Sequence, residues 1–198
     1  MTIACRKSTK DFRWRWCTLA QISTIKMSTP KFRRFQKTGE FVQKHLPKNA
    51  SLLDLGTPNS LSTYLSNAGF NVQNTKGENL DTDYHPYLNT EADCVTAFEI
   101  FEHMLAPFNI LNQLKCNKLI ASVPLKLWFA SAYWNNDDDW DKHYHEFEKK
   151  QFDLLLERTG WEIKDYLLWA SPDHKKIGVR PLLRYITPRY YMVYCERV

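Results

Sequence analysis

Apolar residues along the chain follow two periods, and stretches of the two kinds alternate. An apolar residue at every third or fourth position predicts helices over residues 31–45, 60–68, 107–114 and 148–158. Continuous apolar runs predict buried strands over residues 51–55, 70–73, 93–98 and 118–123. This alternation is typical of a doubly wound, mostly parallel sheet, whose right-handed crossovers place helices on both faces.

The last two apolar stretches differ from the others in how they are connected. Residues 161–170 and 190–196 are rich in aromatic and aliphatic side chains, and a segment containing Pro and Lys joins them. Such a pair suits two antiparallel strands at the edge of a sheet. The whole pattern therefore predicts an α/β fold with three layers: a Rossmann-like, doubly wound, mostly parallel sheet with an antiparallel C-terminal edge pair.

The length and composition indicate one domain. With 198 residues, 43% of them hydrophobic, the chain can bury one full core but is short for two. We expect a single domain over residues 27–198, and a disordered or non-native extension over residues 1–26, where no apolar periodicity is sustained. No run of about 18 apolar residues and no secretory signal is present, so we expect a soluble, cytoplasmic protein without a membrane span.

Positive charge is concentrated at the start of the chain. The first 50 positions hold 12 of the 27 Lys and Arg residues but only two of the 22 acidic residues. This basic segment includes Arg13-Trp14-Arg15-Trp16, and a basic stretch with aromatic side chains is suited to binding nucleic acid. An RNA-directed role is therefore an alternative to a simple extension.

A glycine-containing turn follows the first predicted strand. Gly56 lies between the strand over 51–55 and the helix over 60–68, where a residue without Cβ lets the backbone pass close to a ligand. Because ligands of open α/β sheets bind outside the carboxyl ends of the strands, the turn predicts a nucleotide-cofactor pocket. The turn lacks the three-glycine pyrophosphate fingerprint, which disfavours a nicotinamide-dependent oxidoreductase.

Two segments resemble a known family. Residues 53–56, Leu-Asp-Leu-Gly, are similar to the first motif of the class I S-adenosylmethionine-dependent methyltransferases, an acidic residue two positions before a glycine at the end of strand one. A second segment resembles the family's fourth-strand region, which often ends in a Glu-His pair. This segment is residues 92–104, Ala-Asp-Cys-Val-Thr-Ala-Phe-Glu-Ile-Phe-Glu-His-Met. Taken with their order and separation, the two segments extend the resemblance from Leu52 to about Ile163.

The resemblance implies an enzyme that transfers a methyl group from S-adenosyl-L-methionine to an unidentified small-molecule acceptor. It implies that Asp54 helps to orient the methionine amino group through water or backbone, and that Gly56 and Thr57 line the cofactor. The expected partner is the small-molecule substrate, with the nucleic acid already named as an alternative.

The second matching segment supplies further residues to the implied site. Phe98 and Glu99 would border the adenosine or methionine portion of the cofactor, and His103 would lie at its rim. The alternative for Glu102 and His103 is a solvated first helical turn, where the helix dipole favours an acidic residue.

The chain departs from the family pattern at two places. Pro58 and Ser60 stand where the family usually has glycines, which makes the loop stiffer. An acidic residue normally closes strand two and accepts hydrogen bonds from the ribose hydroxyls, whereas this chain has Asn74 and Thr75 there. Asp81 and Asp83 are alternative acids further along the chain, and Asp81 is the better candidate of the two. These departures leave a second possibility open, a cofactor-binding or non-catalytic pseudoenzyme of the same fold.

Acidic, aromatic and histidine residues gather in the loop over residues 134–147. The resemblance places this region over the substrate pocket, where His143 or His145 suits a general base because the unperturbed pKa of histidine is near neutrality. The acids and the two histidines match no standard metal-ligand spacing, so the sequence predicts no metal site. A lid over the acceptor is expected from the aromatic residues Trp128, Phe129, Tyr133 and Trp134.

Overall fold

Six strands form one sheet in the order β2-β1-β3-β4-β6-β5 in the computed structural model, which describes residues 30–170, 172 and 178–198. The strands are β1 (Ser51–Asp54), β2 (Asn71–Asn74), β3 (Cys94–Phe98), β4 (Lys118–Pro124), β5 (Trp161–Trp169) and β6 (Tyr190–Arg197). Strands β1 to β4 pair in parallel, and β6 runs antiparallel to both β4 and β5. The predicted mostly parallel sheet with an antiparallel C-terminal pair is therefore confirmed.

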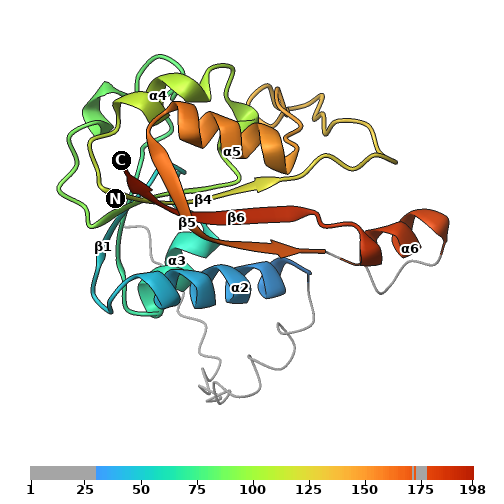
Figure 1. Ribbon diagram of the computed structural model, residues 1–198, viewed down its shortest axis with the longest axis horizontal. Coiled ribbons are helices and arrows are strands. Elements are labelled where there is room, and N and C mark those ends of the chain that lie inside the picture. The colour runs from blue at the N-terminus through green and yellow to red at the C-terminus, as the bar shows by residue number, and fades with distance from the viewer. Residues whose placement is uncertain (1–29, 171, 173–177) are drawn as a thin grey trace, which may run out of the picture.

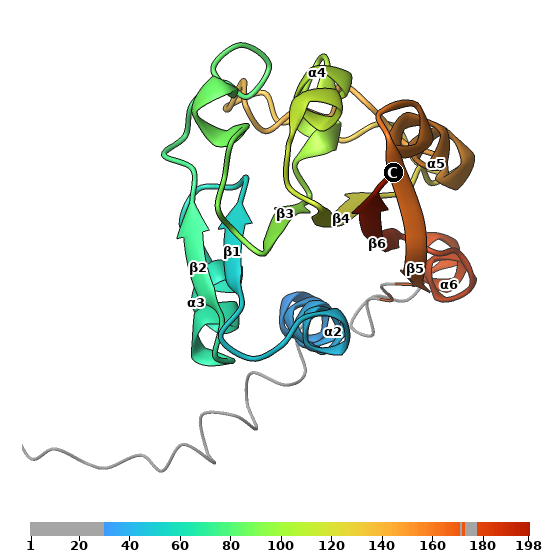
Figure 2. The same ribbon diagram turned by 60° about the vertical axis from the view of Figure 1, so that its left-hand side comes forward.

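Helices cover both faces of this sheet and make three layers. Figure 1 shows α2 and α3 on one face and α4 and α5 on the other, and Figure 2 shows the same layers from a second direction. These helices are α2 (Pro30–His45), α3 (Ser60–Asn67), α4 (Pro107–Gln113) and α5 (Lys149–Arg158). All four coincide within two residues with helices that apolar spacing predicts, because each turns an apolar stripe toward the sheet.

Each face of the sheet has its own apolar core. Successive strand residues point to opposite faces, so neighbours in sequence enter different cores. Leu52 packs with residues of α2 and α3, whereas Leu53 packs with residues of α4 and α5. Cys94 and Val95 divide between the two cores in the same way. Burial on both faces explains why β1 and β3 are continuous apolar runs rather than alternating ones.

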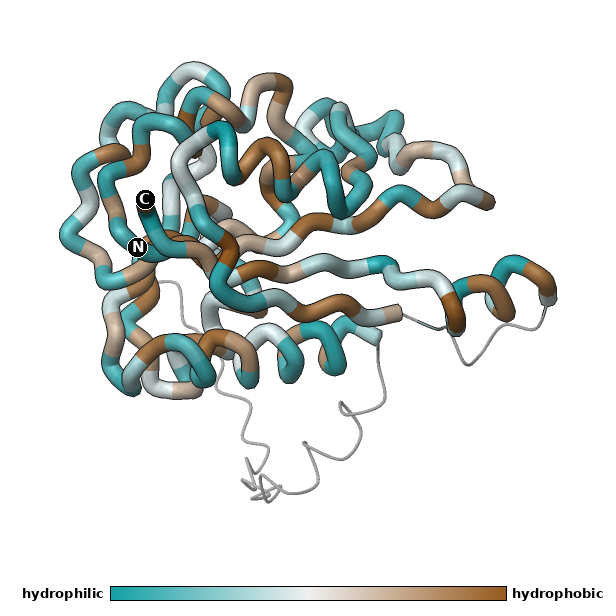
Figure 3. Tube along the Cα trace, in the orientation of Figure 1, coloured by the Kyte–Doolittle hydropathy of each residue, from teal (hydrophilic) through white to brown (hydrophobic). Residues whose placement is uncertain are grey.

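Two connections differ from the simple strand-helix alternation. Among the described residues, the segment between β2 and β3 contains no α-helix, only the 3-10 helix η1 (His85–Tyr87). The segment between β5 and β6 contains α6 (Val179–Ile186), which the sequence does not predict. Helix α6 buries none of its residues, and its hydrophobic positions appear as brown segments of the trace at the right of Figure 3. Its apolar residues Val179, Leu182, Leu183 and Ile186 do have helical spacing, but the Pro in this segment favours a connection between two strands over a helix.

Helix α3 begins directly after the glycine turn and is fixed there by its cap. The Asn59 Oδ1 atom accepts hydrogen bonds from the backbone N–H groups of Leu61, at 2.8 Å, and Ser62, at 3.2 Å. The Ser62 hydroxyl in turn accepts the Asn59 backbone N–H at 2.8 Å, which completes a capping box. The cap therefore holds the end of the turn over the carboxyl edge of the sheet.

Some sequence predictions fall beyond this description. Residues 1–26, for which a disordered or non-native extension is expected, lie outside the described residues. None of the helices in the described ranges combines the length and the apolar character that a membrane crossing requires.

Candidate functional site

Two cavities meet at the glycine turn, beside the carboxyl ends of β1 and β3, and Gly56 lines both of them. The first, here called the Glu99 cavity, has a volume of about 170 Å³ and is lined mainly by Lys31, Arg34, Thr38, Asp54, Asn59, Phe98, Glu99 and Ser122. The second, here called the Asp81 cavity, has a volume of about 340 Å³ and is lined mainly by Thr57, Thr75, Glu78, Leu80, Asp81, Ile100, His103 and Trp140.

Gly56 is not required by the protein's own packing. An added Cβ would meet the Ile100 Cδ1 atom at 3.4 Å and the Asp54 Oδ2 atom at 3.5 Å, and the residue is not among the glycines with positive φ. A side chain would therefore fit the chain but would project where the two cavities join. This arrangement suits a backbone segment that a ligand approaches closely.

Asp54 ends β1 as a buried carboxyl that is hydrogen-bonded on both oxygens. Its Oδ1 atom accepts from the Thr96 hydroxyl at 3.0 Å, and its Oδ2 atom accepts from the Asn74 amide at 2.9 Å. Burial raises the pKa of Asp54 to about 7, although the bonds from Thr96, Gly56 and Asn74 act in the opposite direction. The group can therefore change its charge near neutral pH.

The residues that close β2 fasten the turn to the sheet. The Asn74 amide donates to the Gly56 carbonyl oxygen at 2.9 Å as well as to Asp54, so both of its N–H groups are engaged. The Thr75 hydroxyl donates to the Leu55 carbonyl oxygen at 2.9 Å. These two residues, which the family pattern would place at the ribose, thus hold the shape of the turn from the protein side.

Glu99 follows β3 with φ of 57°, a left-handed conformation that costs a residue with a side chain about 1–2 kcal/mol. Its backbone N–H donates to the Ser122 carbonyl oxygen at 2.9 Å, and the Ser122 hydroxyl donates to its Oε1 atom at 3.0 Å. The Arg34 guanidinium lies 3.5 Å from the other oxygen. Burial raises the pKa of Glu99, while Arg34 and Ser122 counteract the rise. Strain and contacts together direct a carboxylate into the cavity beside Asp54.

Asp81 lines the second cavity and also holds the chain before α4. Its two carboxylate oxygens accept the backbone N–H groups of Leu105, at 2.9 Å, and Ala106, at 2.7 Å. Thr57 and His103 line the same cavity, from the glycine turn and from the 3-10 helix η2 (Phe101–His103) respectively. Phe98 instead lines the Glu99 cavity. Of the expected cofactor residues, all except Asn74 thus line one of the two cavities.

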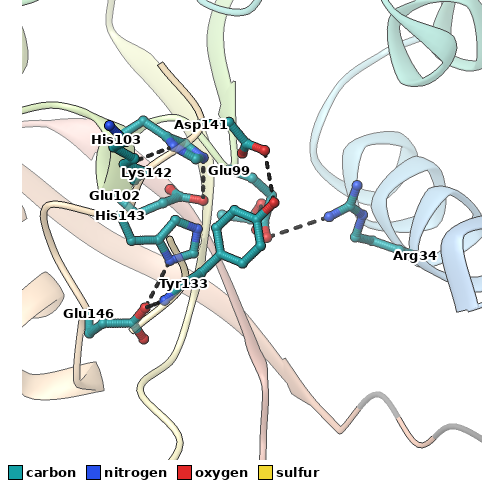
Figure 4. A network of polar contacts seen from close by, with 10 residues as sticks. Arg34, Glu99, Glu102, His103, Tyr133, Asp141, Lys142, His143 and Glu146 are labelled. Carbon is teal, nitrogen blue, oxygen red and sulfur yellow. Dashed lines mark hydrogen bonds and ion pairs between the residues drawn. The ribbon is translucent and has the colours of Figure 1, made fainter. Parts of the chain in front are cut away.

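A buried carboxyl lies beside this site, next to two histidines (Figure 4). Glu102 is 1% exposed, and neither of its carboxylate oxygens has a hydrogen-bond partner among the described residues. Burial, with the nearby charge of Glu99, raises the pKa of Glu102 well above its ordinary value. The His103 Nε2 atom is 3.8 Å from the Glu102 Oε1 atom, and the ring of His143 meets that of His103 edge-on, with centroids 4.9 Å apart.

The two histidines proposed as catalytic residues point to different partners. His143 is buried and bonds the Glu146 carboxylate through Nδ1 at 3.0 Å, and burial lowers the pKa of His143. His145 donates from Nε2 to the Leu105 carbonyl oxygen at 3.3 Å. The loop that carries them is anchored to η2, because the Glu102 carbonyl oxygen accepts the backbone N–H groups of Tyr144 and His145.

The aromatic residues of the expected lid are mostly open to solvent. Trp128 is 73% exposed and Trp134 is 55% exposed; Trp140 is 69% exposed as well, although it also lines the Asp81 cavity. Sequence reasoning missed Trp140, and it also missed Arg34 and Lys31 of α2, which line the Glu99 cavity. Two basic residues beside the apolar stripe of α2 are a weak signal, because Lys and Arg ordinarily occupy solvated helix faces.

Comparisons with known proteins find likeness in structure but not in sequence. No protein-family model matches the chain, and a search of curated proteins finds no match. One similar solved structure is a chain of a Haloferax volcanii complex, with a TM-score of 0.57 and 14% identity. That complex joins the Trm112 methyltransferase activator and a protein described as a methyltransferase. The match covers 83% of this chain and 91% of that one.

Two further structures match over similar lengths. Magnesium protoporphyrin IX methyltransferase from Synechocystis PCC 6803 with bound SAH gives a TM-score of 0.55 at 13% identity, over 85% of this chain and 84% of that one. A Listeria monocytogenes protein described as an S-adenosylmethionine-dependent methyltransferase gives 0.52 at 12% identity, over 83% and 99%. The chain thus has the fold of the class I S-adenosylmethionine-dependent methyltransferases, as the two sequence motifs predict.

Proposed function

We propose that the chain binds S-adenosyl-L-methionine and transfers its methyl group to a small-molecule acceptor. The observation that carries this proposal is the pair of cavities that share Gly56, because their linings suit the amino acid half and the nucleoside half of this cofactor. The fold shared with methyltransferases supports the same assignment.

The Glu99 cavity suits the amino acid half of the cofactor. The carboxyl groups of Asp54 and Glu99 line it and can accept hydrogen bonds from an ammonium group, while Lys31 and Arg34 of α2 can pair with a carboxylate. Opposite charges thus line a small space, as a zwitterion requires. In this proposal, Phe98 and Gly56 border the linker between the two halves of the cofactor.

The Asp81 cavity suits the nucleoside half. Leu80 and Ile100 supply apolar surface for a purine ring, and Thr57 supplies a hydroxyl near the turn. Asp81 already accepts two backbone hydrogen bonds, but a carboxylate has about four acceptor positions, so it can also accept a ribose hydroxyl. In this proposal, Asn74 and Thr75 act indirectly, by fixing the shape of the glycine turn.

Methyl transfer requires the protein mainly to align the acceptor with the methyl group. When bound, S-adenosylmethionine supplies a methyl group on a sulfonium, which is already an activated leaving group. The chain's residues then have to orient the acceptor, exclude water and remove a proton where the accepting atom carries one. Of the two candidate bases, His145 leaves its Nδ1 atom unprotonated when its Nε2–H bonds Leu105, so that atom can accept the proton.

Calorimetry with S-adenosylhomocysteine tests the cofactor site. We expect micromolar binding, weakened at least about tenfold by Glu99→Gln, since a charge-assisted hydrogen bond to the ammonium is worth roughly 1.5–3 kcal/mol. Glu91→Gln is the matched control, because Glu91 is an exposed carboxylate at the opposite end of β3. Wild-type protein that does not bind the ligand, or equal affinity of the two variants, would contradict the proposal.

A non-catalytic binding protein of the same fold is the second candidate. It is favoured by the end of β2, where an amide engaged with Asp54 and Gly56 stands in place of an acid. S-Adenosylhomocysteine binding together with no methyl transfer to any of a panel of hydroxyl and amine acceptors would support it. Unchanged turnover of His145→Ala on an identified acceptor would remove His145 from the mechanism.

A further inference from the structure

Three side chains with metal-binding atoms converge beside the Asp81 cavity. Glu102 and His103 come from η2, and His143 comes from the loop that lies against it (Figure 4). One ligand atom from each residue lies within 4.8 Å of the other two. About 40 positions separate His143 from the other two residues in sequence, so the fold alone brings this group together.

The hydrogen bonds of the two histidines leave a lone pair free on each. The His103 Nδ1 atom is 3.1 Å from the Lys142 carbonyl oxygen, which can only accept, so Nδ1 carries the proton. The His143 Nδ1 atom likewise donates to the Glu146 carboxylate at 3.0 Å. In the neutral ring, both Nε2 atoms are therefore acceptors. A histidine held through one nitrogen by a carbonyl or carboxylate is the arrangement usual for metal ligands.

Glu102 supplies the second, independent observation. It is 1% exposed, and both of its carboxylate oxygens lack a hydrogen-bond partner among the described residues. A buried carboxyl without a hydrogen-bond partner is unfavourable, so native structures normally provide a partner. The nearest cationic candidate is His103, whose Nε2 atom is 3.8 Å away, beyond hydrogen-bond distance.

We propose that Glu102, His103 and His143 bind a divalent transition-metal ion through one carboxylate oxygen and two Nε2 atoms. Two imidazoles with one carboxylate favour Zn²⁺ or a similar ion over Mg²⁺ and Ca²⁺, which prefer oxygen ligands. Metal–ligand bonds of about 2.0–2.2 Å place ligand atoms roughly 3.3–3.5 Å apart in a tetrahedron, so side-chain rotation has to close the present spacing of up to 4.8 Å by at most about 1.5 Å.

Three protein ligands leave at least one position of the ion for water or another oxygen ligand. Because His103 also lines the Asp81 cavity, the ion would border that cavity. This site assigns His143 to the metal rather than to proton transfer, and it leaves His145 as the candidate base. The proposal concerns the ion alone and does not depend on the bound cofactor.

The test is a titration of the full chain, first stripped with a chelator, with Zn²⁺ in competition with a chromophoric indicator. We expect one tight Zn²⁺ site per chain. His103→Ala and His143→Ala should abolish Zn²⁺ binding or weaken it at least about tenfold. Glu146→Gln, which alters the hydrogen-bond partner of the ligand His143, should weaken Zn²⁺ binding about 10- to 100-fold. His85→Ala is the control, since His85 is exposed on η1, and it should bind as wild type does.

A second measurement covers variants that fold poorly. Glu102→Gln keeps the shape of the buried side chain but removes its charge, and Zn²⁺ should raise the unfolding temperature of the wild type and of His85→Ala but not of Glu102→Gln. The proposal is overturned if no stoichiometric site is found. It is equally overturned if Zn²⁺ binds and stabilises Glu102→Gln, His103→Ala and His143→Ala as it does the wild type.

Discussion

Gly56→Ala tests whether a glycine at this position is needed for folding or for ligand binding. The added methyl group would lie 3.4 Å from the Ile100 side chain, 3.5 Å from the Asp54 carboxylate and 3.7 Å from the Asn59 amide. None of these separations is an overlap, so we expect the variant to fold. Where the backbone conformation is compatible, alanine in place of glycine stabilises a protein by about 0.4–1 kcal/mol through the unfolded chain.

The same methyl group would lie where the two cavities join, beside the proposed cofactor. Inserting a methyl group into a packed contact costs about 1–3 kcal/mol. At 25 °C that cost corresponds to roughly a 5- to 160-fold increase in the Kd for S-adenosylhomocysteine. Calorimetry should therefore show weaker binding, while the unfolding free energy from urea denaturation falls by no more than a few tenths of a kcal/mol.

Gly69→Ala is the matched control and should behave in the opposite way. Nothing lies within 4 Å of its added Cβ, but φ of 102° is unfavourable for alanine, so stability should fall while ligand affinity stays unchanged. Equal affinities of Gly56→Ala and wild type would refute the reasoning about Gly56. A large loss of stability in Gly56→Ala would refute it as well, because it would mean that the fold itself requires this glycine.

Three further predictions concern the supports of the site. Burial raises the pKa of Asp54 from an unfolded value near 3.8 to about 7, so between these pH values the folded state binds one more proton than the unfolded state. The unfolding free energy should therefore decline as the pH rises from about 3.8 to about 7. Denaturation experiments at several pH values should show a smaller decline for Asp54→Asn. Asn59→Ala removes the cap of α3 and should cost about 1 kcal/mol of unfolding free energy in urea, whereas an unchanged midpoint would mean that the cap contributes nothing. Ser122→Ala removes a hydrogen bond that lowers the pKa of Glu99, so Glu99 should become protonated at a higher pH in the variant. On acidification, the affinity of the variant for S-adenosylhomocysteine should therefore fall at a higher pH than that of the wild type. Coincident pH profiles would contradict this.

Much of the architecture follows from local patterns. The strands β1, β3 and β4 are buried on both faces and therefore appear as continuous apolar runs, and the helices α2 to α5 carry apolar stripes that match their period. The glycine turn and the segment around β3 likewise point to the edge where the two cavities lie. Helix α6 was not predicted, although Val179, Leu182, Leu183 and Ile186 have helical spacing, because Pro in this segment favours a connection between two strands.

The chemistry of individual residues depended on contacts between distant parts of the chain. Asn74 and Asp81 are polar residues at expected positions, but only the folded chain engages Asn74 with Asp54 and gives Asp81 the N–H groups before α4. In the sequence Glu102 resembles an exposed residue of a helical turn, but in the fold it is buried, and its carbonyl oxygen binds the loop that carries His143. The sequence by itself determined the order of the elements and the edge that carries the site, because periodicity and turn residues act locally. Tertiary structure decided which side chains are buried, unpaired or brought together there, because burial and charge depend on neighbours that are remote in sequence.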